Sequence, residues 1–237
     1  MPQKRHFSRI VVLTGAGVSA ESGLATFRGA SGLWRNLRPE DLASPVAFAC
    51  HPKEVLAFYT ARRRALLAPD VAPNAAHLAL AAFERRFSGE FLLVTQNVDN
   101  LHERAGSKKL RHMHGELLKT RCASCRHEFA STAEFAVGDP CPACGRVGKL
   151  RPAVVWFGET PLFMEEISGA LGRCDLFIAI GTSGQVYPAA GFVEIARHAG
   201  ARTVEMNIEE TTAGSLYDGK IQGPASSVVP GFLEGIG

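Results

Sequence analysis

Apolar runs alternate with longer amphipathic segments along the chain, and this pattern predicts an α/β fold. Two of the runs, residues 91–95 and 176–180, are apolar without interruption, which is typical of strands buried on both faces of a parallel sheet. Further strands are predicted at residues 9–14, 110–113, 152–157 and 203–207, and helices within 39–68 and at 74–87, 189–199 and the end of about 225–236. Strands that alternate with helices favour a Rossmann-like, doubly wound parallel sheet.

Polar or glycine-rich segments come directly after four of the predicted strands. They begin after Thr14, Thr95, Ile180 and Met206. In an open parallel sheet, ligands bind outside the carboxyl ends of the strands. We therefore expect these four segments to meet in one ligand site.

The first of these segments has the form of a turn between a strand and a helix. Gly15 and Gly17 permit a tight turn and the close approach of a ligand to the backbone. The N-terminus of the next helix would offer free N–H groups and its positive dipole to a pyrophosphate. The pattern G-A-G-x-S is not the full G-x-G-x-x-G fingerprint, so an ordinary turn stays an alternative. The glycine turn is followed by a segment that carries aromatic and basic side chains, Phe27, Arg28 and Trp34. A loop with these residue types next to a phosphate-binding turn is typical of a lid over a ligand.

Composition and charge exclude several classes of protein. With 46% hydrophobic and 21% charged residues, the chain can bury a substantial core. A net charge of +3 does not by itself indicate a protein that binds nucleic acid. No apolar run reaches the roughly 18 residues of a membrane span, and the first residues lack the apolar core of a signal peptide. We expect a cytoplasmic protein without nucleic-acid or membrane partners, whose six cysteines are not disulfide-linked.

Four of the cysteines form two C-x-x-C pairs in a segment, residues 120–149, that is poor in aliphatic residues. The pairs are Cys122 with Cys125 and Cys141 with Cys144. Their spacing is typical of a tetrahedral four-cysteine zinc site, with a reduced buried cysteine cluster as the alternative. Because all four ligands come from the protein, we interpret the zinc, one per chain, as structural.

Several motifs together resemble the sirtuins, the NAD-dependent protein lysine deacylases. GAGVSAESGLATFRG at residues 15–29, QNVD at 96–99, HG at 114–115 and GTS at 181–183 occur in the order of that family. Thr26 before Phe27 and Arg28 is closest to the class III sirtuins of bacteria and mitochondria. The resemblance, from about Arg9 to Leu233, implies a single catalytic unit. Its large NAD-binding part would cover about 1–35, 75–115 and 150–237, and its small part a helical insertion, about 36–74, with a zinc module, about 116–149.

The resemblance also implies an activity and the residues that perform it. An acyl group would pass from a lysine side chain to NAD, giving nicotinamide and 2′-O-acyl-ADP-ribose. His114 would be the general base, a role suited to a histidine near neutral pH, and Asn97 would position ribose and water. A core or metal-binding histidine is the alternative. The residues expected to contact NAD are Gly15, Ala16, Gly17, Ser19, Ala20, Glu21, Thr26, Phe27, Arg28, Trp34, Gln96, Asn97, Asp99, Gly181, Thr182, Ser183, Asn207, Glu209 and Ala225.

Two further segments would contact the acylated substrate. The first resembles the family segment that pairs with the peptide backbone as an added strand, and its residues are Val155, Phe157, Gly158 and Glu159. The second is Tyr59 with Arg62, which lie three residues apart on a predicted helix and can face one pocket. The resemblance implies that this pair binds the carboxylate of succinyl- or malonyl-lysine. The alternative is a solvated arginine face beside a core tyrosine.

We interpret the chain as an NAD-dependent deacylase, active on acetyl-lysine and on succinyl- or malonyl-lysine. We expect a monomer whose partners are acyl-lysine proteins or peptides. A mono-ADP-ribosyltransferase, which would use the same NAD with another acceptor, is the nearest alternative. A non-catalytic NAD sensor or zinc-binding module is the second.

Overall fold

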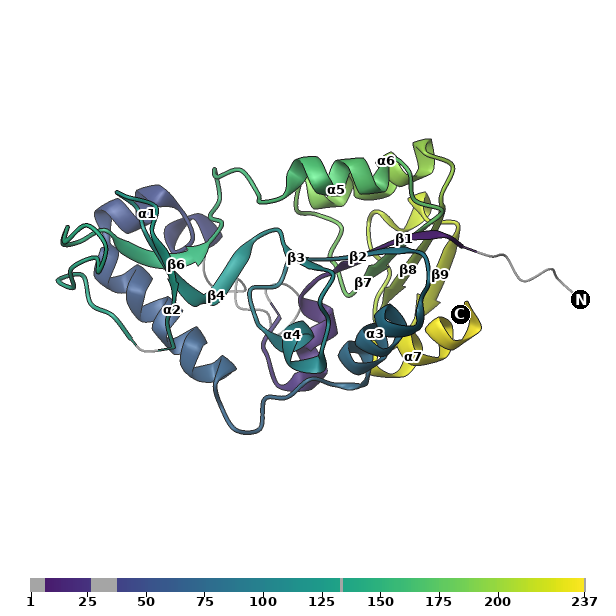
Figure 1. Ribbon diagram of the computed structural model, residues 1–237, viewed down its shortest axis with the longest axis horizontal. Helices are drawn as coiled ribbons and strands as arrows, with labels where there is room; N and C mark the ends of the chain where they lie inside the picture. The colour runs from purple at the N-terminus through teal and green to yellow at the C-terminus, as the bar shows by residue number, and fades with distance from the viewer. Residues whose placement is uncertain (1–6, 27–37, 133, 237) are drawn as a thin grey trace, which may run out of the picture.

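A computed structural model describes residues 7–26, 38–132 and 134–236. The predicted lid residues Phe27, Arg28 and Trp34 lie outside the described residues. The molecule is elongated, with a large parallel sheet at one end and a small antiparallel sheet at the other (Figure 1). In the part of the chain that the structure describes, no helix is long and apolar enough to cross a membrane.

The large sheet has six strands, in the order β3-β2-β1-β7-β8-β9, and every neighbouring pair is parallel. Its strands are β1 (Arg9–Thr14), β2 (Glu90–Thr95), β3 (Leu110–His112), β7 (Leu176–Ile180), β8 (Arg202–Asn207) and β9 (Gly219–Gln222). Thr14 pairs with both Thr95 and Ile180, and Ile180 pairs with Met206. The doubly wound sheet is confirmed, and the four predicted segments start side by side at one edge of it.

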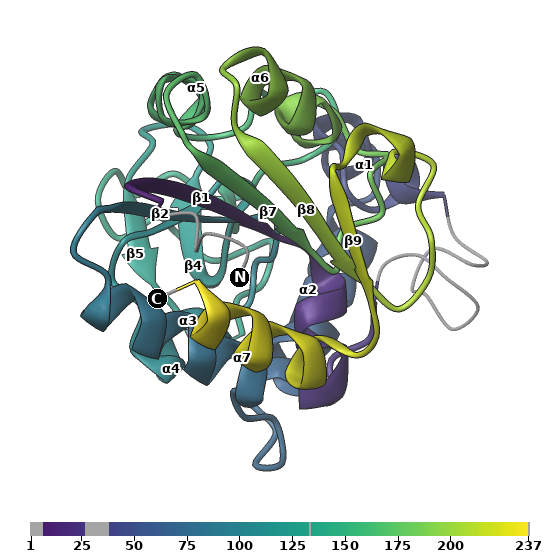
Figure 2. The same ribbon diagram turned by 90° about the vertical axis from the view of Figure 1, so that its right-hand side faces the viewer.

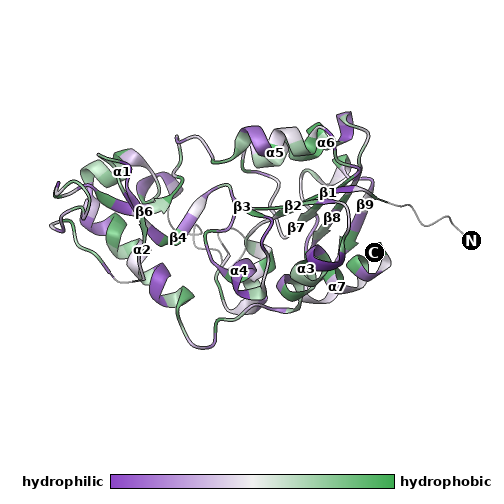
Figure 3. Ribbon diagram, viewed as in Figure 1, coloured by the Kyte–Doolittle hydropathy of each residue, from purple (hydrophilic) through white to green (hydrophobic). Residues whose placement is uncertain are grey.

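Helices cover both faces of this sheet (Figure 2). The helices α3 (Ala75–Arg86) and α7 (Ala225–Gly235) lie on one face, and α5 (Met164–Leu171) and α6 (Phe192–His198) lie on the other. Alternate residues of β1 point to opposite faces: Val12 packs in the core that contains Phe83, and Val11 packs in the core that contains Phe192. In Figure 3 the helices carry both hydrophobic and hydrophilic segments, as expected of elements with one face in a core.

Short local signals set the ends of two helices near the ligand edge. Asn74 caps α3, because its side chain accepts a hydrogen bond from the Ala76 N–H at 2.9 Å. The same amide donates to the Val18 carbonyl at 2.8 Å, which ties the start of α3 to the turn after β1. The helix α4 (Leu101–Ala105) ends at Gly106, whose φ of 103° is open to glycine at little cost.

The small sheet consists of β5 (Glu128–Ala130), β4 (Gly115–Cys122) and β6 (Leu150–Val154). Next to it lie η2 (Pro39–Asp41), α1 (Pro45–Cys50) and α2 (Pro52–Leu66). The predicted helical run within 39–68 is therefore interrupted, and Pro52 begins the second helix because its missing N–H costs nothing there. The predicted strand at 152–157 is shifted to β6, which pairs with β4 and not with the parallel sheet expected for residues after about 150.

Candidate functional site

The turn after β1 packs backbone to backbone against the turn after β7. The N–H groups of Gly15 and Gly17 donate to the carbonyls of Ile180 and Gly181, at 3.0 and 2.9 Å. A Cβ on Gly15 would lie 2.7 Å from the Gly181 oxygen, and one on Gly17 would lie 2.7 Å from the Gly181 Cα. The glycines are thus required by the contact between two turns. The expected α-helix after the turn is instead a seven-residue 3-10 helix, η1 (Ala16–Ser22), so the argument from an α-helix dipole does not apply.

Three buried polar side chains from two segments form the floor of the site. The Ser19 hydroxyl in η1 donates to Asp99 Oδ2 at 3.0 Å, and the Asn97 amide donates to the Ser19 oxygen at 3.1 Å. Asp99 also accepts a hydrogen bond from the Leu101 N–H at 3.1 Å. Burial raises the pKa of Asp99, and these hydrogen bonds oppose the shift. The sequence predicts this meeting of the segments after Thr14 and Thr95.

A cavity of about 90 Å³ opens onto these side chains. It is lined by Ala16, Ser19, Leu24, Ala25, Arg62, Ala65, Leu66, Asn97, Val98, Asp99 and Leu117. Most of the lining is apolar, with a carboxyl group, an amide and a guanidinium among its polar groups. A carboxylate beside an amide in an apolar cavity matches the donors and acceptors of a carboxamide, so the residues fit the nicotinamide end of NAD.

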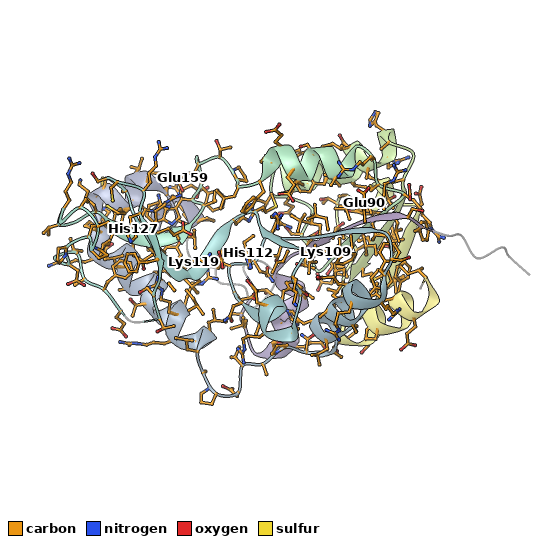
Figure 4. The ribbon with its side chains drawn as sticks, in the orientation of Figure 1. Glu90, Lys109, His112, Lys119, His127 and Glu159 are labelled. Carbon is orange, nitrogen blue, oxygen red and sulfur yellow. The ribbon has the colours of Figure 1, made fainter. Side chains whose placement is uncertain are left out.

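Two histidines anchor the loop that carries Gln96 and Asn97. The Nδ1 atom of His114 lies 3.2 Å from the Gln96 carbonyl oxygen, and Nδ1 of His112 lies 3.0 Å from that of Asn97. Figure 4 labels His112 close to the junction of the two sheets. Donation from Nδ1 leaves Nε2 as the basic atom of a neutral imidazole. In His114 this atom can accept a proton, whereas in His112 it contacts Glu103 at 2.6 Å.

The two histidines differ in their preferred charge. Burial lowers the pKa of His114, and the hydrogen bond to Gln96 opposes this only in part. Burial also acts to lower the pKa of His112, but the hydrogen bond and charge of Glu103 outweigh it and raise that pKa. At neutral pH the structure therefore favours a neutral His114 next to a His112 that holds its proton more tightly.

A further pair of histidines, His77 and His102, lies in the core behind the floor. Their rings are 4.8 Å apart, and His102 Nε2 lies 3.0 Å from the Thr14 hydroxyl. Burial lowers the pKa of His77 to about 4, which keeps its ring neutral. The ring of His77 also approaches the Ser19 hydroxyl, at 3.4 Å. Sequence reasoning missed His77, because nothing in its helical pattern distinguishes it from a core residue.

The other predicted cofactor residues lie at the ends of β7 and β8, in or just after η1, and at the start of α7. The Asn207 amide donates to the Thr182 carbonyl at 2.7 Å, which joins these two strand ends. Glu21 bonds the N–H and hydroxyl of Ser226 at 3.0 and 2.6 Å, and so connects η1 to the start of α7 at Ala225. The contacts of NAD with all the residues predicted for it, Ala20, Thr26, Gly181, Ser183 and Glu209 among them, stay a prediction.

The three consecutive arginines of α2 have three different environments. Arg62 lines the cavity, and its charge acts on the buried Tyr59 hydroxyl. Arg63 is buried and donates to the Leu117 carbonyl at 2.7 Å, while Arg64 is exposed and pairs with Glu134. A uniformly solvated arginine face is therefore excluded.

The predicted peptide-binding segment lies after β6 and contacts the histidine turn. The Val155 N–H donates to the His114 carbonyl and the Phe157 N–H to the Ala43 carbonyl, both at 2.8 Å. Phe157 and Gly158 are exposed. Glu159 forms a two-point ion pair with Arg151, at 2.6 and 2.9 Å, so its carboxylate already has a structural partner.

The four cysteines of the two C-x-x-C pairs come together at the end of β4. The Sγ atoms of Cys122 and Cys144 are 3.8 Å apart, and those of Cys125 and Cys141 are 3.7 Å apart. Zn–S bonds of about 2.3 Å in a tetrahedron place sulfur atoms roughly 3.8 Å from each other. The four thiols therefore fit one zinc ion with no ligand position left for substrate.

The chain is similar to known proteins over nearly its whole length. A model of the Sir2 family matches residues 15–188. The NAD-dependent protein deacylase of Salmonella typhimurium is 54% identical over 234 residues, which cover 99% of this chain and 86% of that protein. A solved Sir2 homolog–NAD complex is 40% identical with a TM-score of 0.88, and covers 97% of this chain and 90% of its own. Sir2Af2 bound to a myristoylated histone peptide is 33% identical with a TM-score of 0.76, and covers 97% and 91%.

Proposed function

The chain belongs to the Sir2 family and is an NAD-dependent protein deacylase, and we propose that it acts on lysines carrying acetyl, succinyl or malonyl groups. The observation that carries this proposal is the shared cavity: Arg62 opens onto the same space as Asn97 and Asp99. A cation there offers a partner to an acidic acyl chain next to the site for nicotinamide. The similarity to an NAD complex and to an acylated-peptide complex supports both ligands.

Asn97 and Asp99 of the floor would bind NAD, and His114, which lies outside the floor, would accept the proton. Bound NAD would supply the acyl acceptor and water the remaining oxygen, so the products are the free lysine, nicotinamide and 2′-O-acyl-ADP-ribose. Asp99 would accept a hydrogen bond from the carboxamide of nicotinamide, and Asn97 would orient the adjacent ribose. His114 would take a ribose hydroxyl proton at Nε2, while its Nδ1 is held by the Gln96 carbonyl. The zinc, with four protein ligands and no open position, has a structural role.

The rate of deacylation should fall only at acidic pH. Burial lowers the pKa of His114 from its ordinary value of 6.5, so His114 stays neutral and able to accept a proton at every pH above that value. We expect kcat/KM for an acylated peptide, followed by nicotinamide release, to be flat through neutral pH and to fall below about pH 6.5. An acid limb centred well above pH 7 would contradict a lowered pKa at the general base.

Tyr59 and Arg62 are proposed to bind the carboxylate of the acyl chain. Arg62→Met should lower the ratio of kcat/KM for succinyl- over acetyl-lysine peptides roughly 10- to 100-fold, the worth of a hydrogen bond to a charged group. Tyr59→Phe should lower the same ratio less, because it removes only a neutral donor. The measurement uses matched peptides that differ in the acyl group alone.

Arg64→Met is the matched control for this experiment. Arg64 lies on the same helix but is exposed and pairs with Glu134, so its loss should leave the succinyl-to-acetyl ratio unchanged. If Arg62→Met and Arg64→Met change the ratio alike, the pocket does not recognise a carboxylate.

Nicotinamide release also separates the deacylase from its alternatives. A deacylase releases nicotinamide only when an acylated peptide is present. A mono-ADP-ribosyltransferase would label protein without acyl-lysine, and an NAD sensor would bind NAD without consuming it. Action as a monomer, in the cytoplasm, stays a prediction of the sequence.

A further inference from the structure

The hydroxyl of Tyr59 has a fixed hydrogen-bond polarity. The indole Nε1 of Trp156 lies 2.9 Å from the Tyr59 oxygen. An indole N–H can only donate, so the phenolic oxygen is the acceptor in this pair. The hydroxyl hydrogen must then point to something else. Within residues 7–26, 38–132 and 134–236, the Tyr59 hydroxyl has no second hydrogen-bond partner.

Trp156 is itself held firmly in place. The guanidinium carbon of Arg151 lies 3.3 Å from the centre of its ring, and Arg151 is fixed by the two-point pair with Glu159. The backbone N–H of Trp156 also donates to Glu159 at 2.8 Å, and the Phe48 ring packs 5.3 Å from the indole. Only 2% of Trp156 is exposed, so the indole cannot turn away from Tyr59.

The charges around the Tyr59 hydroxyl favour an anion as its partner. Burial raises the pKa of Tyr59 to about 12, so the hydroxyl keeps its hydrogen across the physiological range. The charge of Arg62, one helical turn further along α2, acts to lower this pKa, as does that of Arg151, while the charge of Glu159 acts to raise it. A protonated hydroxyl donor beside a guanidinium is a pair suited to a carboxylate.

We propose that Trp156 is a positioning residue for acyl-chain selection, which directs the Tyr59 hydroxyl hydrogen toward the carboxylate of a succinyl or malonyl group. The proposal rests on the proposed role of Tyr59 and Arg62 in binding that carboxylate. Without the indole N–H, the phenol could turn and present its oxygen to the carboxylate, which repels it. An acetyl group carries no carboxylate, so this orientation matters much less for deacetylation.

Trp156→Phe tests the proposal because it removes the N–H and keeps an aromatic ring over Arg151. We expect the ratio of kcat/KM for succinyl- over acetyl-lysine peptide to fall about five- to tenfold, the worth of one hydrogen bond. The loss should appear mainly as a higher KM for the succinyl peptide. Phe48→Leu is the control, since it removes packing against Trp156 but keeps the hydrogen bond, and should leave the ratio unchanged.

A double-mutant cycle with Tyr59→Phe excludes a general packing effect. If Trp156 acts through the Tyr59 hydroxyl, Trp156→Phe should add no further loss of the ratio in the Tyr59→Phe background. Full additivity would overturn the proposal, as would an equal loss in Phe48→Leu. Should Trp156→Phe fail to fold, 3-benzothienylalanine at position 156 keeps the shape of indole and replaces its N–H by sulfur, with the same expected result.

The outcomes distinguish this proposal from the proposed function. If Arg62→Met leaves the succinyl-to-acetyl ratio unchanged, the carboxylate pocket is wrong and the role of Trp156 falls with it. If Arg62→Met and Tyr59→Phe lower the ratio and Trp156→Phe does not, the pocket stands and only the positioning role of Trp156 is overturned.

Discussion

Replacing His114 by alanine should lower kcat for deacylation about 10²- to 10⁴-fold, the usual worth of a positioned general base. His114 presents Nε2 as its basic atom, since Nδ1 is bonded to the Gln96 carbonyl. The alanine variant lacks that atom but keeps the floor formed by Ser19, Asn97 and Asp99. We therefore expect NAD to bind with an affinity close to that of the wild type, measured by calorimetry, while single-turnover product formation is nearly lost.

The control for this prediction is a histidine with no contact to the site. His198 is exposed near the end of α6 and bonds only the Glu194 carbonyl of its own helix among the described residues. His198→Ala should keep the wild-type rate. If His114→Ala retains more than about a tenth of the wild-type kcat, another group is the base. If the variant also loses NAD binding and its melting transition, His114 is needed chiefly for the fold of the turn.

The sequence predicts the parallel sheet and its ligand edge, because these depend on local pattern, although it does not predict the edge strand β9. Unbroken apolar runs such as 176–180 can only be buried on both faces, and parallel connections bring their ends to one edge. The cysteine spacing also predicts the four-thiol cluster without any knowledge of the fold. Both predictions are confirmed.

Contacts between distant segments away from the ligand edge of the large sheet could not be predicted from the sequence. Buried and partly exposed residues do not alternate regularly along β4, because its pairing register with β6 shifts between Glu116 and Thr120. The sequence pattern therefore does not predict this strand. Arg63 looks like part of a charged surface, yet it is buried because the Leu117 carbonyl of β4 accepts its hydrogen bond. The hydrogen bond from Trp156 to Tyr59 joins residues 97 positions apart, and no local pattern indicates it.

The glycines at positions 15 and 17 are needed for a reason that the motif alone does not indicate. The sequence explains them by the approach of a ligand, and the structure adds a requirement of the fold itself: the turn after β7 leaves no room for a Cβ. The glycines of this family motif are therefore required by the packing of two turns, in addition to any contact with a ligand. Alanine at Gly15 would be expected to disturb both turns at once.

Removing the zinc should unfold the small sheet and abolish activity, even though the metal touches no substrate. Cys122 ends β4, and Cys141 is buried with Leu150 of β6 in a small core of their own. Zinc binding to such thiols is worth about 10 kcal/mol or more, so its loss leaves this core without its main support. Because β4 begins at Gly115, next to His114, disorder in β4 would reach the general base.

Cys141→Ser should therefore lower the zinc content below one per chain, reduce the melting temperature by roughly 10 °C or more, and abolish deacylation. Zinc content, circular dichroism and nicotinamide release measure the three effects on one preparation. Cys50→Ser is the matched control, because Cys50 is exposed in α1 and lies outside the four-thiol cluster, and it should retain zinc, stability and rate. A Cys141→Ser protein that holds no zinc yet melts and turns over like the wild type would show that the metal does not support β4, and that the position of His114 is set by the parallel sheet alone.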